Sequence, residues 1–138
     1  MPTNSHEQAL VTAFHRAMKI PAPSEPTMLT PDQGALRYRL IDEEAREFLE
    51  ASEDGDWLEM VDALVDLLYV TYGTAVGMGV ELAPFFQEVH IANMRKEPGS
   101  DSGKSVKPEG WVAPDLAGVF KRVHGNRPLP VKGARASS

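Results

Sequence analysis

Apolar residues recur along most of the chain at three- and four-residue intervals, the spacing of a helix that buries one face. Capping residues that are followed three positions later by Gln or Glu mark three helix starts, at Ser5, Thr30 and Asp56. No segment alternates apolar and polar residues as a half-buried strand does. The pattern predicts four main helices and one short helix, over about residues 6–18, 31–52, 57–77, 83–96 and 115–123.

Proline and glycine separate these segments and predict the connections between them. A short turn covers residues 54–56, and a loop rich in Gly, Ser, Pro and Lys covers residues 98–114. The expected fold class is all-α, a four-helix bundle with a C-terminal loop and a short helix. We expect one domain over residues 1–124, followed by a polar, disordered tail over residues 125–138.

The composition narrows the classes of function. A length of 138 residues with 42% hydrophobic content suits one domain with a substantial core. The net charge of -6 argues against nucleic-acid binding through a basic face. The chain has no cysteine, which excludes disulfides and thiolate metal sites and fits a reducing, cytoplasmic location.

Neither export nor membrane insertion is expected. The first residues lack the basic and apolar regions of a signal peptide. The most apolar stretch, residues 58–80, carries the three charged residues Glu59, Asp62 and Asp66. A membrane-spanning helix would tolerate these charges poorly.

Acidic residues form a stripe on the second predicted helix. Glu43, Glu47 and Glu50 lie on the side opposite its apolar residues, with Glu44 at the edge of the stripe. A stripe of this kind is commonly a solvated face. Leu40 precedes the glutamates on the same side, however, and a face that changes from apolar to acidic also fits the wall of a pocket.

The third predicted helix carries a second acidic stripe. Nearly all of its positions are apolar, aromatic or small, and its only charges are Glu59, Asp62 and Asp66, spaced by three and four residues. Carboxylates drawn into a buried stripe repel each other and lose hydration, and bound cations relieve both effects. The alternative is that Glu59 completes a helix cap while both aspartates face solvent along a narrow strip.

The short turn between the two helices predicts an antiparallel hairpin. Counting outward from the turn pairs Glu50 with Glu59, Glu47 with Asp62, and Glu43 with Asp66, so the two stripes fall into register. All of these ligands offer oxygen, which suits Mg²⁺, with Mn²⁺ as a substitute, rather than zinc or copper.

These motifs resemble those of a known superfamily. Glu44-x-x-Glu47 followed by Glu59-x-x-Asp62 is similar to the paired E-x-x-E and E-x-x-D motifs of the MazG-like all-α nucleoside triphosphate pyrophosphohydrolases, which include dimeric dUTPases and phosphoribosyl-ATP pyrophosphohydrolases. The resemblance covers roughly residues 10–120 and includes Asp62-Ala63-Leu64-x-Asp66, Glu88-Val89-His90-x-x-Asn93 and Gly103-Lys104-x-x-Lys107.

The resemblance implies magnesium ligands and a reaction. Its ligands would be Glu44, Glu47, Glu59 and Asp62, and the reaction would release pyrophosphate by cleavage between the α and β phosphates of a nucleoside triphosphate. Glu43 is our candidate for the base that takes the proton of the attacking water, or for a ligand of a second metal. Glu47 is assigned to both the catalytic and the metal-binding set. Glu50 and Asp66 are weaker candidates for Glu43's role.

Substrate-binding residues are expected after the carboxylate helices. Asn93 offers a donor and an acceptor to a base or sugar, although an Asn near a helix end also serves as a cap. Lys104 and Lys107 lie in the loop and could close over the triphosphate. Arg95 and Lys96 could assist them, or simply complement the C-terminus of the fourth helix.

The favoured substrate is dUTP, which would make the chain a house-cleaning enzyme of the nucleotide pool. Alternatives are phosphoribosyl-ATP, another non-canonical triphosphate, or a non-catalytic helical dimer that binds metal or nucleotide. A redox di-iron bundle needs Glu-x-x-His on two helices, and no histidine here follows a glutamate by three residues. Because the third helix is apolar almost all round, we expect a homodimer or a dimer of dimers that buries it.

Overall fold

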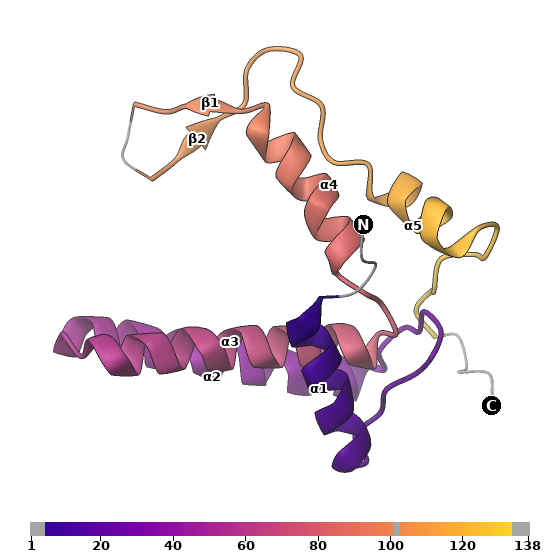
Figure 1. Cartoon of the computed structure of the whole chain (residues 1–138), viewed down its shortest axis with the longest axis horizontal. Coiled ribbons are helices and arrows are strands. Elements are labelled where there is room, and N and C mark those ends of the chain that lie inside the picture. Colours follow the sequence, from indigo (N-terminus) through magenta and orange to yellow (C-terminus); the bar gives the residue numbers. More distant parts are fainter. Residues whose placement is uncertain (1–4, 101–102, 134–138) are drawn as a thin grey trace. The chain divides into compact units, whose positions relative to one another are not determined.

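The computed structural model describes residues 5–100 and 103–133. Within these ranges the chain forms five helices and one two-stranded hairpin, which confirms the all-α class. The elements are α1 (His6–Ala17), α2 (Pro31–Asp54), α3 (Trp57–Gly77), α4 (Ala83–Met94), β1 (Glu97–Pro98), β2 (Ser105–Val106) and α5 (Leu116–His124). Figure 1 shows them along the chain.

The main departure from the expected elements is a small antiparallel hairpin that begins at Glu97, at the start of the loop expected over residues 98–114. Glu97 opposes Val106, and Pro98 opposes Ser105. Each strand has only two residues, too few to show the alternation that identifies a strand in a sequence.

The chain divides into two compact units. One contains α1, α2 and α3 with the segment that starts at Leu129, and the other contains α4, the hairpin and α5 as far as Pro128. The expected single domain over residues 1–124 and the disordered tail over residues 125–138 stay predictions, and residues 134–138 lie outside the described part.

The first unit is organised by the helical hairpin of α2 and α3, which pack along each other (Figure 1). At the start of α2, the Thr30 side chain accepts a hydrogen bond from the Gln33 N–H while the Gln33 side chain accepts one from the Thr30 N–H, as the capping box predicted. Gly55 ends α2 in the left-handed conformation, with a φ of 69°, and Asp56 caps α3 at once. The tight turn therefore fixes the two helices side by side.

Helix α1 packs against the C-terminal part of α3. His15 of α1 is 2% exposed, and its Nδ1 lies 3.1 Å from the carbonyl oxygen of Pro21. Since a carbonyl only accepts, Nδ1 carries the proton, and Nε2 can accept the hydrogen bond that Arg37 donates from α2 at 3.4 Å. Gly73 of α3 lies against both side chains. One buried histidine thus joins all three helices.

In the second unit, helices α4 and α5 contact each other, and the connection between them is tied to α4. The Trp111 indole N–H donates to the carbonyl oxygen of Ala92 at 2.8 Å. The Asp115 N–H, at the start of α5, donates to Glu88 Oε1 at 3.2 Å. Two residues of α4 therefore fix the path of the chain from the hairpin to α5.

One apolar face of helix α3 is exposed in the described part of the chain. Trp57, Val61, Leu64 and Leu68 share this face at helical spacing, and Trp57 is 70% exposed. By length and composition α3 is long and apolar enough to cross a membrane, a test that buried helices of soluble proteins also pass. Its carboxylates lie on the opposite side, at about 130–190° from the centre of the apolar face at 100° per residue.

Candidate functional site

Three carboxylates from two helices converge in the first unit. Glu44 and Glu47 of α2 and Asp66 of α3 each place one oxygen so that all three lie within 4.8 Å of one another. Three negative charges this close destabilise one another unless a proton or a cation intervenes. This cluster is the candidate metal site of the α2–α3 hairpin.

Small residues next to the carboxylates bring the two helices together here. Ala51 lies seven residues after Glu44, hence on the same face of α2, and it is 7% exposed. Ala63 precedes Asp66 by three residues on the inward face of α3 and is 3% exposed. The faces that carry Glu44 and Asp66 are therefore the packed faces of the hairpin.

The electrostatics of the cluster follow from this burial. Burial raises the pKa of Glu44 to about 7, and the neighbouring carboxylates of Glu47, Asp66 and Glu43 act in the same direction, Glu47 also through a side-chain hydrogen bond. Burial likewise raises the pKa of Asp66, assisted by the charges of Asp62 and Glu47. Both carboxyl groups hold protons more tightly than an exposed acid does.

One carboxylate oxygen of the cluster lacks a hydrogen-bond partner in the described part of the chain. Glu44 Oε2 is buried and has no hydrogen-bond partner within the described residues. A buried acceptor without a partner is unfavourable, and a divalent cation would supply the missing interaction while neutralising the adjacent charges. With oxygen as the only donor type, the cluster fits a hard cation such as Mg²⁺ or Mn²⁺.

Next to the cluster, toward the turn, lies an acidic pocket of about 190 Å³. It contains three of the four ligands implied by the resemblance, Glu47, Glu59 and Asp62, and Glu47 belongs also to the cluster. The six carboxylate residues that line it are Glu47, Glu50, Asp54, Asp56, Glu59 and Asp62. Asp56 is already engaged, because its carboxylate accepts the Glu59 N–H at 3.2 Å.

The structure thus brings Glu44 and Glu47 together with Asp66, while Glu59 and Asp62 lie in the adjoining pocket. The sequence treated Asp66 as a minor candidate. Its signal was the three-then-four spacing from Glu59, which extends the acidic stripe one turn beyond the E-x-x-D motif.

Glu43 lies on another side of α2. It lines a groove of about 580 Å³ together with Leu36, Arg39, Leu40, Arg46, Glu47 and Glu50. Glu47 and Glu50 line both this groove and the acidic pocket. A group bound in the groove would therefore contact Glu43 and the two glutamates shared with the pocket.

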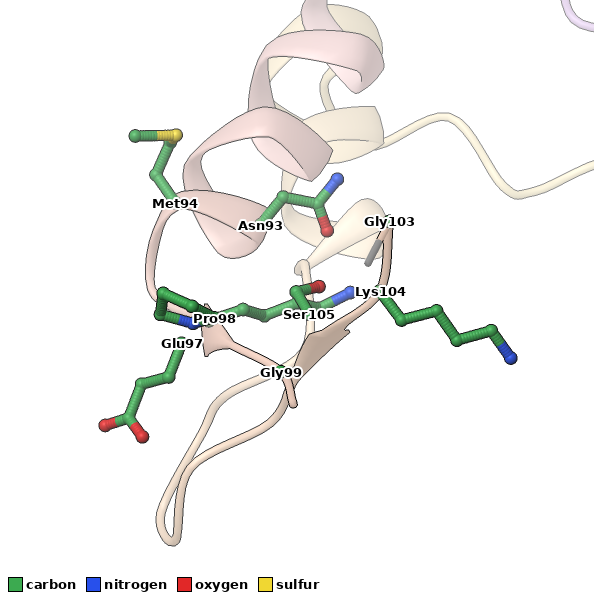
Figure 2. Close-up of a pocket in the computed structure, with 9 residues that line it drawn as sticks. Asn93, Met94, Glu97, Pro98, Gly99, Gly103, Lys104 and Ser105 are labelled. Carbon is green, nitrogen blue, oxygen red and sulfur yellow. The ribbon is translucent and has the colours of Figure 1, made fainter. Parts of the chain in front are cut away.

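Three of the expected substrate-binding residues line one pocket in the second unit. Asn93, Lys96 and Lys104 border a space of about 570 Å³ between the end of α4 and the hairpin. Figure 2 shows the Asn93 amide extending from α4 toward Gly103, the Lys104 side chain extending outward, and the Glu97 carboxylate pointing away from Asn93. Arg95 and Lys107 do not line this pocket.

Trp111 was not identified as a site residue from the sequence. The Lys96 Nζ lies 5.3 Å and the Lys107 Nζ 5.0 Å from the centre of its ring, within the range of cation–π interactions. The signal in the sequence was a large aromatic residue directly after Gly110 in a polar loop. A loop residue of this kind lies outside the helical core, and here its ring contacts two lysine side chains.

Comparison with known proteins identifies a family for this chain. A sequence model of the family described as phosphoribosyl-ATP pyrophosphohydrolase matches residues 11–93, more than half of the chain. None of the curated proteins compared with the chain matches it. The matched region contains the carboxylate cluster, the acidic pocket and Asn93, whereas Lys96, the hairpin and Trp111 follow it. The chain therefore belongs to the phosphoribosyl-ATP pyrophosphohydrolase family, within the MazG-like all-α superfamily.

Proposed function

We propose that this chain is a divalent-metal-dependent nucleoside triphosphate pyrophosphohydrolase. It would hydrolyse the bond between the α and β phosphates to give a nucleoside monophosphate and pyrophosphate. The observation that carries the proposal is the convergence of Glu44, Glu47 and Asp66 oxygens within 4.8 Å, with one buried oxygen of Glu44 unpartnered. The family to which the chain belongs is named for this type of cleavage.

The proposed cofactor is Mg²⁺, with Mn²⁺ as a substitute. Glu44, Glu47 and Asp66 would hold it, and Glu59 and Asp62 extend the set of oxygen donors into the adjoining pocket. Bound there, the cation would neutralise phosphate oxygens and the charge that develops at phosphorus. The chain itself supplies the carboxylates at fixed positions, because both helices are packed against each other at this level.

Glu43 is the proposed base for the attacking water. It lies in the groove that it shares with Glu47 and Glu50, beside the cluster but not among its three converging residues. A carboxylate that is not committed to a cation can accept a proton from water. Asn93, Lys96 and Lys104, which line one pocket, are the proposed contacts to the nucleoside and the phosphate chain, with Arg95 and Lys107 as additional cations.

The first substrate proposed is dUTP, with a house-cleaning role in the nucleotide pool. Phosphoribosyl-ATP is the second, and the family match favours it. Both present the same α–β phosphate bond to the same carboxylates, so they differ in the groups recognised outside the cluster. A direct comparison of turnover is the way to choose between them.

We further propose a homodimer, or a dimer of dimers, that covers the apolar face of α3. Four large side chains at helical spacing are exposed on this face, on the side opposite the carboxylates. Leu68→Glu should then shift the mass measured by light scattering toward the monomer. Leu10→Glu is the matched control, since Leu10 on α1 is 55% exposed and Leu68 is 56% exposed. A wild-type chain that is monomeric at high concentration would rule this out.

The test of the activity is pyrophosphate release from dUTP, phosphoribosyl-ATP and a panel of other nucleotides, with and without Mg²⁺ or Mn²⁺. Turnover should require metal. Glu47→Gln should lower it by more than the roughly 10- to 100-fold typical of residues that only support a metal ligand. Glu53→Gln is the control, because it removes an exposed charge from the last turn of the same helix. Folded, metal-loaded protein that releases no pyrophosphate from any of them would contradict the proposal.

A further inference from the structure

The hairpin register brings two lysines to one side of the second unit. Glu97 opposes Val106, so the next positions outward from this pair are Lys96 and Lys107. Side chains of opposed residues in an antiparallel pair project to the same face. Both ammonium groups accordingly meet the same indole ring, that of Trp111.

Trp111 is held in place by hydrogen bonds that do not involve the two lysines. Its indole N–H donates to the carbonyl oxygen of Ala92 at 2.8 Å, and Ala92 is 2% exposed. Its backbone N–H donates to the carbonyl oxygen of Pro108 at 3.0 Å, across a turn in which Gly110 has a φ of 78°. The ring is therefore held against the end of α4, and it sets the position of both lysines.

The two ammonium groups contact the indole ring but are not paired with a negative charge in the described part of the chain. Neither Lys96 nor Lys107 forms an ion pair with a carboxylate in residues 5–100 and 103–133. A cation–π contact at an exposed position is worth only about 0.5–1 kcal/mol, so an anion of several charges can displace it. Lys96 also lines the pocket that contains Asn93 and Lys104.

We propose that Trp111 is a positioning residue for a condensed-phosphate site built by Lys96 and Lys107. The ligand class is pyrophosphate or a triphosphate chain, because linked phosphates offer two ammonium groups more negative charge and more acceptor oxygens than a single small anion does. The use of this site in turnover rests on the proposed function. Trp111 follows the region that matches the family, so the family match does not assign it a role.

The indole ring also gives a direct readout. The chain has two tryptophans, and Trp57→Phe leaves Trp111 as the only one. Inorganic pyrophosphate and tripolyphosphate, added in the absence of metal, should change Trp111 emission saturably as the ammonium groups leave the ring. Sulfate at equal ionic strength should not. Lys107→Met in the same background should weaken the midpoint about tenfold, whereas Lys121→Met, which removes a charge from α5, should leave it unchanged.

Kinetic constants and stability together distinguish a positioning role of Trp111 from a role in folding. Trp111→Leu should raise KM about tenfold and leave kcat within about twofold, with helical content and thermal stability checked by circular dichroism. Trp111→Phe keeps a ring but loses the bond to Ala92, and it should lie between wild type and Trp111→Leu.

The two proposals fail separately. The condensed-phosphate site would be overturned, and the proposed function left intact, by an active enzyme with two properties. Its Trp111 emission would not change with pyrophosphate or tripolyphosphate, and Trp111→Leu would not change its KM. A saturable response that Lys107→Met weakens, in a chain that turns over no nucleotide, would support the site and overturn the proposed function.

Discussion

Glu44 on α2 and Asp66 on α3 place carboxylate oxygens within 4.8 Å of each other on the packed faces of a helical hairpin. Both pKa values are raised, in each case chiefly by burial. The hairpin therefore holds its acids under electrostatic strain. In the metal-free protein protons relieve this strain, and a divalent cation would relieve it in the loaded protein.

The first prediction concerns the pH dependence of metal-free stability. Glu44 keeps its proton up to about pH 7 in the folded chain, whereas its ordinary pKa is 4.5. Between these values the folded state binds more protons than the unfolded state, so stability falls as pH rises. The melting temperature in EDTA should decrease by a few degrees from pH 5 to pH 8.

Glu44→Gln tests the origin of this slope. The variant removes the titrating group and should flatten the dependence, while Glu53→Gln should keep the wild-type slope. Because protons and metal compete for the same oxygens, metal affinity should rise over the same pH range. A Glu44→Gln protein with the wild-type slope would show that other groups cause it.

The Asp66 carboxylate should be needed for metal binding. In the metal-free protein it should lower the stability of the fold. Asp66→Asn removes one of three converging charges, so in EDTA the variant should melt at the same or a higher temperature than wild type. Addition of Mn²⁺ should raise the melting temperature of wild type but have much less effect on the variant. An Asp66→Asn protein that gains as much stability from Mn²⁺ as wild type would remove Asp66 from the ligand set.

Substitution of Glu43 should affect turnover but not metal binding. If it acts as the base, Glu43→Gln should lower kcat about 100-fold or more, the usual contribution of a positioned general base. It should preserve the stabilisation by Mn²⁺, because Glu43 is not among the three converging residues. Loss of that stabilisation together with activity would instead make Glu43 a metal ligand.

The sequence predicted the helices well because their start signals are local. Ser5, Thr30 and Asp56 each accept the expected hydrogen bond from the backbone three residues later. The pairing of carboxylates was accurate in part, because the members of the two pairs nearest the turn line one pocket. In the third pair Glu44, and not Glu43, lies in the cluster with Asp66. Counting from the turn gives the height of each residue along a hairpin but not the rotation of each helix about its axis.

That rotation is set by packing. Adjacent residues on a helix differ by about 100°, so only one of Glu43 and Glu44 can face α3. Burial of Ala51 and Ala63 turns Glu44 inward and leaves Glu43 on the groove, although the count from the turn had paired Glu43 with Asp66. The role of Trp111 was missed for a similar reason, since it depends on a hairpin with strands of only two residues.

The junction of the three N-terminal helices gives the last prediction. A Cβ on Gly73 would lie 3.0 Å from His15 Nε2 and 3.2 Å from Arg37 Nη1, closer than a relaxed contact. Gly34 on α2 is the matched control, since a Cβ there would meet nothing within 4 Å. Alanine gains up to roughly 1 kcal/mol over glycine within a helix, so Gly34→Ala, in the first turn of α2, should be stabilising.

At Gly73 this gain is opposed by overpacking, which costs about 1–3 kcal/mol. Arg37 can move aside, but His15 is buried and its Nδ1 is held by the Pro21 carbonyl at 3.1 Å. Gly73→Ala should therefore be less stable than Gly34→Ala by about 1–3 kcal/mol in urea unfolding followed by circular dichroism. Equal stability of the two variants would mean that the His15 ring yields to the methyl group, and that its hydrogen bonds to Pro21 and Arg37 contribute little to holding α1 against α3.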